Sequence, residues 1–313
     1  MTPKEQYRNF EKLQELPLFF QPWWLDTVCS AWDVALTEEK GVITGVMPYQ
    51  LEKKSGLVII RNPDMTPYLG PFFFYPEKLD AQEKTTWEDR VLKDLLGQLP
   101  RYDSCNVLGL PGQDNFLSFY QRGFKYTSLL TYHIDLGQPE AKLYAAVHRN
   151  HRYLIKQAQP LHTTDEGPDY LEELLELHYG TFSRKKKKYT YSREFLVRMI
   201  EASLRAGQGK ILVAKDGNQQ VVAGLLLLWD GHTMYLLISA VAKDTAHPGV
   251  VRLLIWEAIC LARRMGLRIF DFEGSMDPGI EPFFRRFGGS RQYYLYCIHH
   301  RSLIWKIKRT LLG

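Results

Sequence analysis

Three strand-length apolar runs follow one another in the second half of the chain, separated only by short turn sequences. The runs cover residues 210–215, 221–229 and 233–240. The segments between them contain Asp216-Gly217-Asn218 and Asp230-Gly231, which are typical of the tight turns that join antiparallel strands. We therefore predict three consecutive antiparallel strands, and any fold proposed for this chain has to contain them.

Helix-length segments and single strands surround these three strands. The predicted helices cover 141–158, 170–182, 192–206, 250–265 and 280–287, and the predicted single strands cover 161–164, 267–273 and 292–298. Ser192 is a typical N-cap residue. The helix at 250–265 is apolar around most of its circumference, so we expect one face to pack on its own sheet and the other on the first domain. The resulting order is helix, strand, two helices, three antiparallel strands, helix, strand, helix and strand.

The first half of the chain alternates short strands with two helices. After a polar N-terminal helix and an aromatic cluster, we predict strands at 32–37, 42–50, 57–60, 68–75, 104–108 and 125–136, and helices at 83–99 and after Pro111-Gly112. Turn residues separate most of these segments.

The length of 313 residues favours two domains. We place the boundary at Gly137-Gln138-Pro139, which gives domains at 1–137 and 138–313. The first holds 14 basic and 18 acidic residues, a net charge of −4, and the second holds 26 basic and 17 acidic residues, a net charge of +9. Only the second half therefore has the charge to meet an anionic ligand.

Several function classes find no support in the sequence. It has no P-loop, no Gly-x-Ser-x-Gly elbow, no dinucleotide fingerprint and no His-Glu-x-x-His motif. The pairs His148/His151 and His299-His300 lack a third ligand at usable spacing, so we predict no metal site. The four cysteines show no Cys-x-x-Cys spacing and are interpreted as reduced core residues. The polar N-terminal segment and the absence of a membrane-spanning apolar run predict a cytoplasmic protein.

The segment at 270–289, FDFEGSMDPGIEPFFRRFGG, carries the most suggestive polar residues. Asp271 and Glu273 lie two apart on the predicted strand, so we expect both side chains on one face. Open sheets place ligands at the ends of such strands. The alternative is structural: one or both carboxylates pair with a neighbouring arginine such as Arg285 or Arg286.

The helix at 141–158 carries basic residues at helical spacing, namely His148, Arg149, Arg152 and Lys156. Because they form one stripe, they suit the phosphates of coenzyme A, of a nucleotide sugar or of tRNA. The alternative is a solvated helix face. The basic run at 184–188 is interpreted mainly as a surface loop.

The element order resembles the GNAT N-acetyltransferase fold, and the first half is similar to a degenerate copy of it. The 270–289 signature, together with R-N-H-R-Y-x-I-K-Q-A at 149–158, is similar to the tandem branch that includes the Fem-type peptidoglycan aminoacyltransferases. The resemblance implies an α/β (α+β) fold of two tandem GNAT-like domains, each a mixed, mostly antiparallel sheet flanked by helices. The degenerate domain would cover 1–137, and the acyltransferase domain would cover 138–313 with a basic amphipathic tail at 301–312.

The same resemblance implies an N-acyltransferase that moves an acyl or aminoacyl group to an amine acceptor of the cell envelope or to a small molecule. The donor would be acyl-CoA or aminoacyl-tRNA, and no metal would take part. The candidate catalytic residues are Asp271, Glu273, Ser275 and Tyr235. For Ser275 and Tyr235, a role in a turn or in the core is the alternative. The candidate phosphate-binding residues are Arg149, Arg152, Lys156, Gly249 and Arg285.

The chain departs from the family pattern at the start of the helix at 250–265. Acyl-CoA users typically have several glycines there, whose N–H groups cradle a pyrophosphate. Here the sequence is His247-Pro248-Gly249, and Pro248 has no N–H to donate. Phe283 and Phe284 stand where a general-acid tyrosine is often found. These departures favour an aminoacyl-tRNA donor, although the long helical hairpin of the Fem enzymes is also missing. A catalytically silent binding protein for an anionic ligand stays open.

Overall fold

The structure of the chain, a computed structural model, describes residues 1–184, 190–242 and 247–302. Most of the basic run at 184–188 and the tail beyond Ser302 therefore lie outside the described residues. The chain forms two compact units, Met1–Leu130 with Gln292–Gly313, and Thr131–Arg291. The last strand thus belongs with the N-terminal part of the chain, whereas our division at residue 137 assigned it to the second half. That division stays a prediction.

The N-terminal unit is built on strands in the order β1-β2-β3-β5-β12. These strands are β1 (Trp32–Glu39), β2 (Val42–Lys54), β3 (Leu57–Arg61), β5 (Ser104–Leu108) and β12 (Ser290–His300), whose first two residues belong to the other unit. The strand pairs β1–β2, β2–β3 and β5–β12 are antiparallel, and β3 and β5 are parallel. The predicted strand at 68–75 is reduced to β4 (Phe72–Phe73), beside β2. Pro71 cannot donate to a sheet ladder, which explains the short strand.

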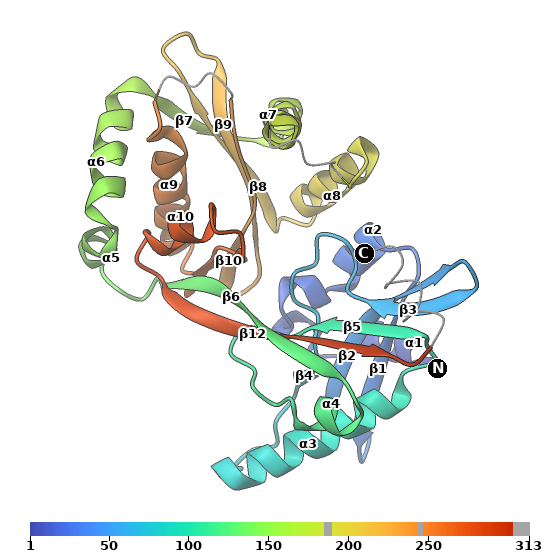
Figure 1. Cartoon of the computed structure of the whole chain (residues 1–313). Coiled ribbons are helices and arrows are strands. Elements are labelled where there is room, and N and C mark those ends of the chain that lie inside the picture. Colours follow the sequence, from blue (N-terminus) through green and yellow to red (C-terminus); the bar gives the residue numbers. More distant parts are fainter. Residues whose placement is uncertain (185–189, 243–246, 303–313) are drawn as a thin grey trace. The chain divides into compact units, whose positions relative to one another are not determined.

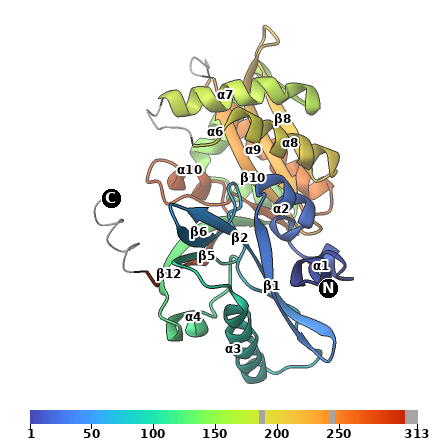
Figure 2. The ribbon, with the colours of Figure 1, turned by 90° about the vertical axis from the view of Figure 1, so that its right-hand side faces the viewer.

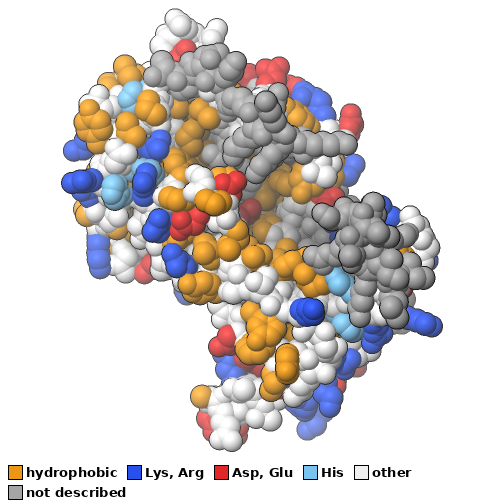
Figure 3. Space-filling model, in the orientation of Figure 1, with side chains coloured by type: hydrophobic (Ala, Val, Ile, Leu, Met, Phe, Trp, Pro, Cys, Tyr) orange, Lys and Arg blue, Asp and Glu red, His pale blue; other side chains and the backbone are white. Residues whose placement is uncertain are grey.

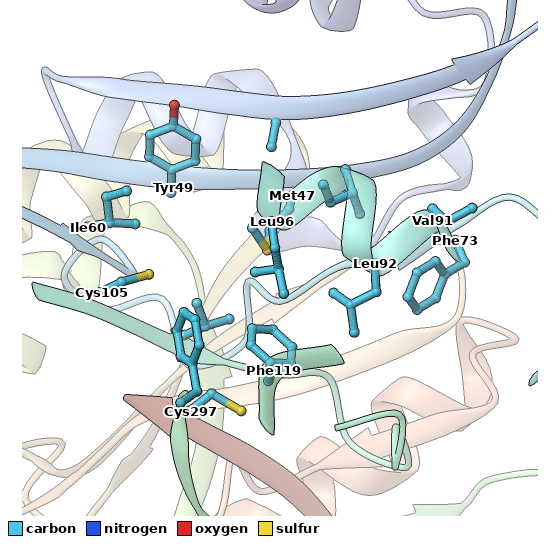
Figure 4. Close-up of a cluster of buried hydrophobic side chains, with 14 of the residues drawn as sticks. Met47, Tyr49, Ile60, Phe73, Val91, Leu92, Leu96, Cys105, Phe119 and Cys297 are labelled. Atoms are coloured by element: carbon cyan, nitrogen blue, oxygen red, sulfur yellow. The ribbon is translucent and has the colours of Figure 1, made fainter. Parts of the chain in front are cut away.

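The longest helix of this unit is α3 (Ala81–Gln98), and it supplies much of the core. Its buried residues Trp87, Val91 and Leu95 follow one face at helical spacing. They pack with side chains of β2, β5 and β12 in the cluster drawn in Figure 4. Smaller helices complete the unit: α1 (Pro3–Arg8), α2 (Pro22–Val28) and α4 (Leu117–Gln121). The core of this unit therefore includes Cys297, from a strand near the end of the chain.

The C-terminal unit has the strand order β6-β11-β10-β9-β8-β7. The strands are β6 (Lys125–Asp135, of which 131–135 lie in this unit), β11 (Ile269–Asp271), β10 (Thr233–Val241), β9 (Val221–Trp229), β8 (Gly209–Lys215) and β7 (Thr163–Glu166). Only β10 and β11 are parallel. The prediction of three consecutive antiparallel strands is confirmed in β8, β9 and β10.

Helices cover both faces of this sheet. Figures 1 and 2 show α7 (Leu171–Arg184) and α8 (Arg193–Arg205) on one face and α9 (Val250–Arg264) on the other. The Ser192 hydroxyl accepts a hydrogen bond from the Phe195 N–H, which confirms the predicted N-cap. One side of α9 packs on its own sheet, as predicted, and its other side packs against α6 (Arg149–Ala158) of the same unit, where the sequence predicted the first domain. No helix in the described part of the chain combines the length and the apolar character needed to span a membrane.

Two predicted elements of this unit are wrong in extent. The predicted helix at 141–158 is split into α5 (Glu140–Ala146) and α6, because His148 leaves the helical conformation and caps α6. The His148 N–H donates instead to the carbonyl oxygen of Arg286, which follows α10 (Glu281–Arg285). The predicted strand at 267–273 ends early, at Asp271. The backbone of Glu273 is left-handed, with φ of 56°, and cannot continue a strand.

Candidate active site

The parallel strands β10 and β11 separate early, because β11 ends at Asp271 while β10 continues for six residues beyond Tyr235, to its C-terminal end at Val241. They pair at only three positions, from Thr233 with Ile269 to Tyr235 with Asp271. On its other edge β10 stays paired with β9 as far as Val241, with a register shift between Leu236 and Ile238. The extra residue of this bulge, Leu237, has no opposite residue in β9, and a bulge leaves such a residue outside the regular ladder. The opening therefore begins two residues beyond the last β10–β11 pair.

A pocket of about 380 Å³ lies along this end of β10. Its walls come from three elements: the last residues of β10, the start of α9, and one phenylalanine of α10. The lining residues are Ser239, Ala240, Val241, Ala242, His247, Pro248, Val250, Val251, Arg252 and Phe283. The described lining residues are mostly apolar, and among them Arg252 is the one charged side chain apart from the titratable His247. Such a pocket suits a ligand with an apolar part and an anionic part.

Arg252 is held in place without a carboxylate partner in the described part of the chain. Its Nε donates to Nδ1 of His151 at 3.1 Å, and its Nη1 donates to the carbonyl oxygen of Pro248. The guanidinium carbon lies 4.9 Å from the ring centroid of Phe283. Burial, together with the nearby charge of Arg286, lowers the pKa of Arg252. Because Arg252 has no carboxylate partner among the described residues, an anion in the pocket would meet a cation that lacks a counter-charge.

His151 fixes the orientation of Arg252. The side chain is fully buried, and burial lowers its pKa to about 4, with the charge of Arg252 as the second cause. The imidazole is therefore neutral at pH 7. Because the guanidinium is always a donor, Nδ1 of His151 accepts, and this assigns the ring proton to Nε2, which lies 3.1 Å from the carbonyl oxygen of Phe283. One neutral histidine thus connects α6, α9 and α10.

The basic residues predicted from the sequence to bind phosphate include two neighbours of His151, Arg149 and Arg152, but not Arg252. A signal was present, since Arg252 is the one basic residue in the first turns of an otherwise apolar helix. The functional meaning of that position became visible only when the pocket and the buried histidine were known.

The predicted basic stripe lies on the outer side of α6. Arg149 and Lys156 are exposed, and Nη1 of Arg152 donates to the carbonyl oxygen of Ala145 at 2.5 Å. Figure 3 shows Lys, Arg and His side chains gathered over the region where α5 and α6 lie. None of the three residues lines the pocket at β10, whereas Lys156 lines a second pocket of about 410 Å³ among α5, α6 and α9. The stripe is therefore a surface feature separate from Arg252.

Gly249 lies at the start of α9 and is needed there for packing. A Cβ atom at this position would lie 2.1 Å from the carbonyl oxygen of Leu154 in α6, a distance that no real Cβ contact shows. The Gly249 N–H donates to Nδ1 of His247 at 3.0 Å, and the Val250 N–H donates to the carbonyl oxygen of His247 at 3.3 Å. Two N–H groups at this helix start thus already have acceptors within the chain.

Asp271 is buried and accepts hydrogen bonds from its surroundings. The Thr131 hydroxyl donates to Oδ1 at 2.6 Å, and the Glu273 N–H donates to the same oxygen at 2.8 Å. Nε2 of His133 lies 3.1 Å from Oδ2. Arg285, one of the two arginines named as structural partners, lies 3.3 Å from the carboxylate of Glu281 in its own helix.

Glu273 lies two residues beyond Asp271, directly after the strand ends. One carboxylate oxygen, Oε1, is buried and has no hydrogen-bond partner among the described residues. Burial raises the pKa of Glu273 well above its ordinary value, and the charge of Asp271 raises it further. Its left-handed backbone is uncommon for a residue with a side chain and costs conformational energy. The expectation that both acids share one strand face is wrong, since only Asp271 lies on the strand.

The other two candidate catalytic side chains have local partners. The buried Tyr235 hydroxyl donates to Oδ2 of Asp230 at 2.8 Å, and Oδ1 of Asp230 accepts from the backbone of the β9–β10 hairpin. Burial raises the pKa of Tyr235 well above its ordinary value. The Ser275 hydroxyl oxygen accepts from the Asp277 N–H at 3.1 Å, within a turn. Both contacts fit the structural alternatives that the sequence left open. The described residues contain no group of three potential metal ligands.

Comparisons with known proteins agree with this geometry. Residues 141–285 match the sequence model of a family described as an acetyltransferase (GNAT) domain. No curated protein sequence matches the chain. Among solved structures, FemX is similar with a TM-score of 0.65 and 13% identity, over 88% of this chain and 90% of FemX.

Two further structures are similar at lower scores. A tandem GNAT protein from the clavulanic acid biosynthesis pathway has a TM-score of 0.52 and 10% identity, over 90% of this chain and 86% of its own. L-PGS from Bacillus licheniformis has a TM-score of 0.51 and 12% identity, over 85% of this chain and 84% of its own. The chain therefore has the fold of the tandem GNAT, Fem-like acyltransferases, with a GNAT domain at residues 141–285.

Proposed function

We propose that this chain is an N-acyltransferase that moves an acyl or aminoacyl group from an activated donor to an amine, with Glu273 as the proton acceptor. The carboxylate of Glu273 is the observation that carries the proposal. Its Oε1 is buried without a hydrogen-bond partner among the residues that the structure describes, and its backbone is left-handed. Both features cost stability, and such costs are typically retained where a side chain has a chemical role.

In the proposed reaction, the amine nitrogen forms a bond to the donor's acyl carbon, and the bond from that carbon to the leaving oxygen or sulfur breaks. One proton passes from the amine to Glu273, which releases it to the leaving group or to water. A carboxylate with a raised pKa is a stronger base than an ordinary one, which helps it to accept the one proton that the neutral amine loses. Asp271 is a positioning residue in this proposal, because it accepts the Glu273 N–H.

The geometry of the two strands supports the position of the acyl group. Leu237 and Glu273 each lie two residues beyond the last β10–β11 pair, which joins Tyr235 and Asp271. They therefore mark the two edges of the opening. A backbone N–H outside the strand ladder, as expected at the Leu237 bulge, is a suitable donor to the oxyanion that forms on the acyl group.

The donor would place its anionic part in the pocket beside Arg252. Two observations favour aminoacyl-tRNA over acyl-CoA. The N–H groups of Gly249 and Val250 are bonded to His247, so the usual pyrophosphate cradle is weak. The exposed basic stripe of α6 suits a polyanion larger than the pocket. In this view Arg149, Arg152, Lys156 and Arg285 would contact the donor outside the pocket. The second candidate, acyl-CoA, is favoured by the match to an acetyltransferase domain. The acceptor would be an amine of the cell envelope or of a small molecule.

Calorimetry separates the donors. Aminoacylated bulk tRNA, coenzyme A and acetyl-coenzyme A are each titrated into the protein, into Arg252→Met and into the control Arg205→Met, which changes an exposed arginine of α8. We expect tRNA to bind, and Arg252→Met to weaken it by about tenfold, as for the loss of a charge-assisted hydrogen bond. Heat with acetyl-coenzyme A and none with tRNA would replace the leading candidate by the second.

Transfer of the labelled acyl group to a mixture of amines then tests Glu273. Glu273→Gln should lower the transfer rate by about 10²- to 10⁴-fold, the usual contribution of general base catalysis, with donor binding unchanged. An unchanged rate in Glu273→Gln would remove this residue from the mechanism. Donor binding without transfer to any amine would instead identify a silent binding protein for an anionic ligand.

A further inference from the structure

A group of large apolar side chains is exposed on the N-terminal unit, which contains none of the candidate site residues. It is formed by α4 and the start of β6. The exposed fractions are 37% for Phe116, 46% for Leu117, 63% for Tyr120 and 45% for Tyr126. The rings of Phe116 and Tyr126 contact each other at 4.6 Å between centroids. We call these four residues the aromatic patch. A contiguous apolar patch of this kind marks a binding surface more often than isolated exposed side chains do.

The short helix α4 exposes this patch because its opposite side already fills the core. Phe119 is buried against Phe124, with ring centroids 5.2 Å apart. The Ser118 hydroxyl is also buried and donates to the carbonyl oxygen of Asp89 in α3. The helix cannot rotate to hide Tyr120 without exposing Phe119. The exposure of the patch therefore follows from the way the unit packs.

Basic side chains surround the aromatic patch. Arg122 and Lys125 are exposed in the turn between α4 and β6, and Arg122 donates to the carbonyl oxygen of the exposed Lys93. One exposed acid, Asp114, precedes the patch in the sequence. Figure 3 shows hydrophobic side chains over the region of α4, with Lys or Arg and His side chains beside them. An apolar surface with this border suits a partner that is apolar inside and anionic at its surface.

Arg301, just after β12, adds an exposed positive charge to the same unit. The turn after α4 contacts the end of β12, since the rings of Phe124 and His299 lie 4.9 Å apart. Arg301 is exposed just beyond this contact. From residue 292 to residue 313 the sequence contains four basic residues and no acid, so the unit formed by 1–130 and 292–313 holds 18 basic and 17 acidic residues, a net charge of +1, whereas residues 1–137 alone carry −4.

We propose that the aromatic patch docks on an anionic lipid surface. Tyrosine and tryptophan favour the interface between lipid and water, and lysine and arginine are attracted to anionic headgroups. A single weak anchor binds a membrane only marginally, whereas an apolar contact combined with basic residues binds it reversibly. The proposal is independent of the acyl-transfer chemistry, because no residue of the patch lies in the C-terminal unit.

Vesicle sedimentation tests the proposal with the full chain. We compare vesicles of phosphatidylglycerol mixed with phosphatidylcholine against vesicles of phosphatidylcholine alone, at low and high salt. The test variant is Leu117→Ser/Tyr120→Ser. The control is Tyr153→Ser, which removes a tyrosine of α6 that is equally exposed, at 61%. Circular dichroism and thermal melting establish that each variant is folded.

We expect the protein and Tyr153→Ser to sediment with the anionic vesicles and to be released by salt, and the double variant to lose at least about fivefold in binding. A chain cut after Ser302 should bind more weakly than the full chain but still respond to the double substitution. The proposal is wrong if the full chain ignores anionic vesicles, or if the double variant binds as well as the control. Self-association that the double variant abolishes, without vesicle binding, would assign the patch to a second copy of the chain instead.

Discussion

Replacing Gly249 with alanine should destabilise the C-terminal unit strongly. The added Cβ would meet the carbonyl oxygen of Leu154 at 2.1 Å and the ring of His247 at 2.8 Å. The nearer atom belongs to the backbone of α6, so it can move only if α6 and α9 separate. Overpacking of this kind costs about 1–3 kcal/mol and occasionally more. We expect a value near the upper end, since the overlap exceeds 1 Å relative to an ordinary contact of about 3.4 Å.

Differential scanning calorimetry measures this effect. For a unit of this size, each kcal/mol shifts the melting temperature by about 2–4 °C, so Gly249→Ala should lower it by about 4–12 °C. The matched control is Gly217→Ala in the same unit, where an added Cβ meets nothing within 4 Å. If both variants melt within 1–2 °C of each other, the close approach of α6 to α9 is not what requires a glycine. In that case a ligand-binding reason for Gly249 would gain weight.

Three further predictions concern titratable groups. Burial raises the pKa of Glu273 above its unfolded value, so this residue lowers the free energy of unfolding as the pH rises above about 4.5. Urea unfolding should therefore show Glu273→Gln to be more stable than the parent at pH 7 and equal to it near pH 3. Burial lowers the pKa of His151 from 6.5 to about 4. The stability that the neutral imidazole contributes is therefore fully present above pH 6.5 and is lost as the pH falls toward 4. Over that range the free energy of unfolding of the parent should fall by about 3 kcal/mol more than that of His151→Gln. A similar loss in both proteins would mean that His151 is solvated. The four buried cysteines are free, so thiol labelling of the native protein should be slow and should speed up on unfolding; rapid labelling before unfolding would contradict their burial.

Much of the fold could be predicted because its signals are local. The runs that became β8, β9 and β10 have apolar residues and turn sequences within a few positions of each other. Ser192 lies directly before its helix. The break between α5 and α6 had no such signal. It depends on the carbonyl oxygen of Arg286, which lies far along the chain and accepts the His148 N–H.

The candidate site could be located from the sequence but not resolved into roles. In the sequence, Asp271 and Glu273 are two acidic residues two positions apart, and nothing distinguishes their roles. The structure separates them, because Thr131 and the backbone of Glu273 bond to Asp271 while Oε1 of Glu273 is left without a partner in the described part of the chain. Arg252 became meaningful only with His151 and Phe283 in contact. Long-range contacts of this kind cannot be read from local patterns.

The place of β12 has a consequence for synthesis on the ribosome. The N-terminal unit needs residues 292–300 to pair with β5 and to bring Cys297 into its core. These residues are translated after the whole of Thr131–Arg291, which forms the other unit without them. The N-terminal unit, whose first 130 residues are translated first, can therefore complete its fold only after β12 has been translated. The unit at Thr131–Arg291 can fold as soon as it emerges from the ribosome. A nascent chain that stops before β12 would leave β5 without this partner strand and the core without Cys297, and would become a substrate for chaperones.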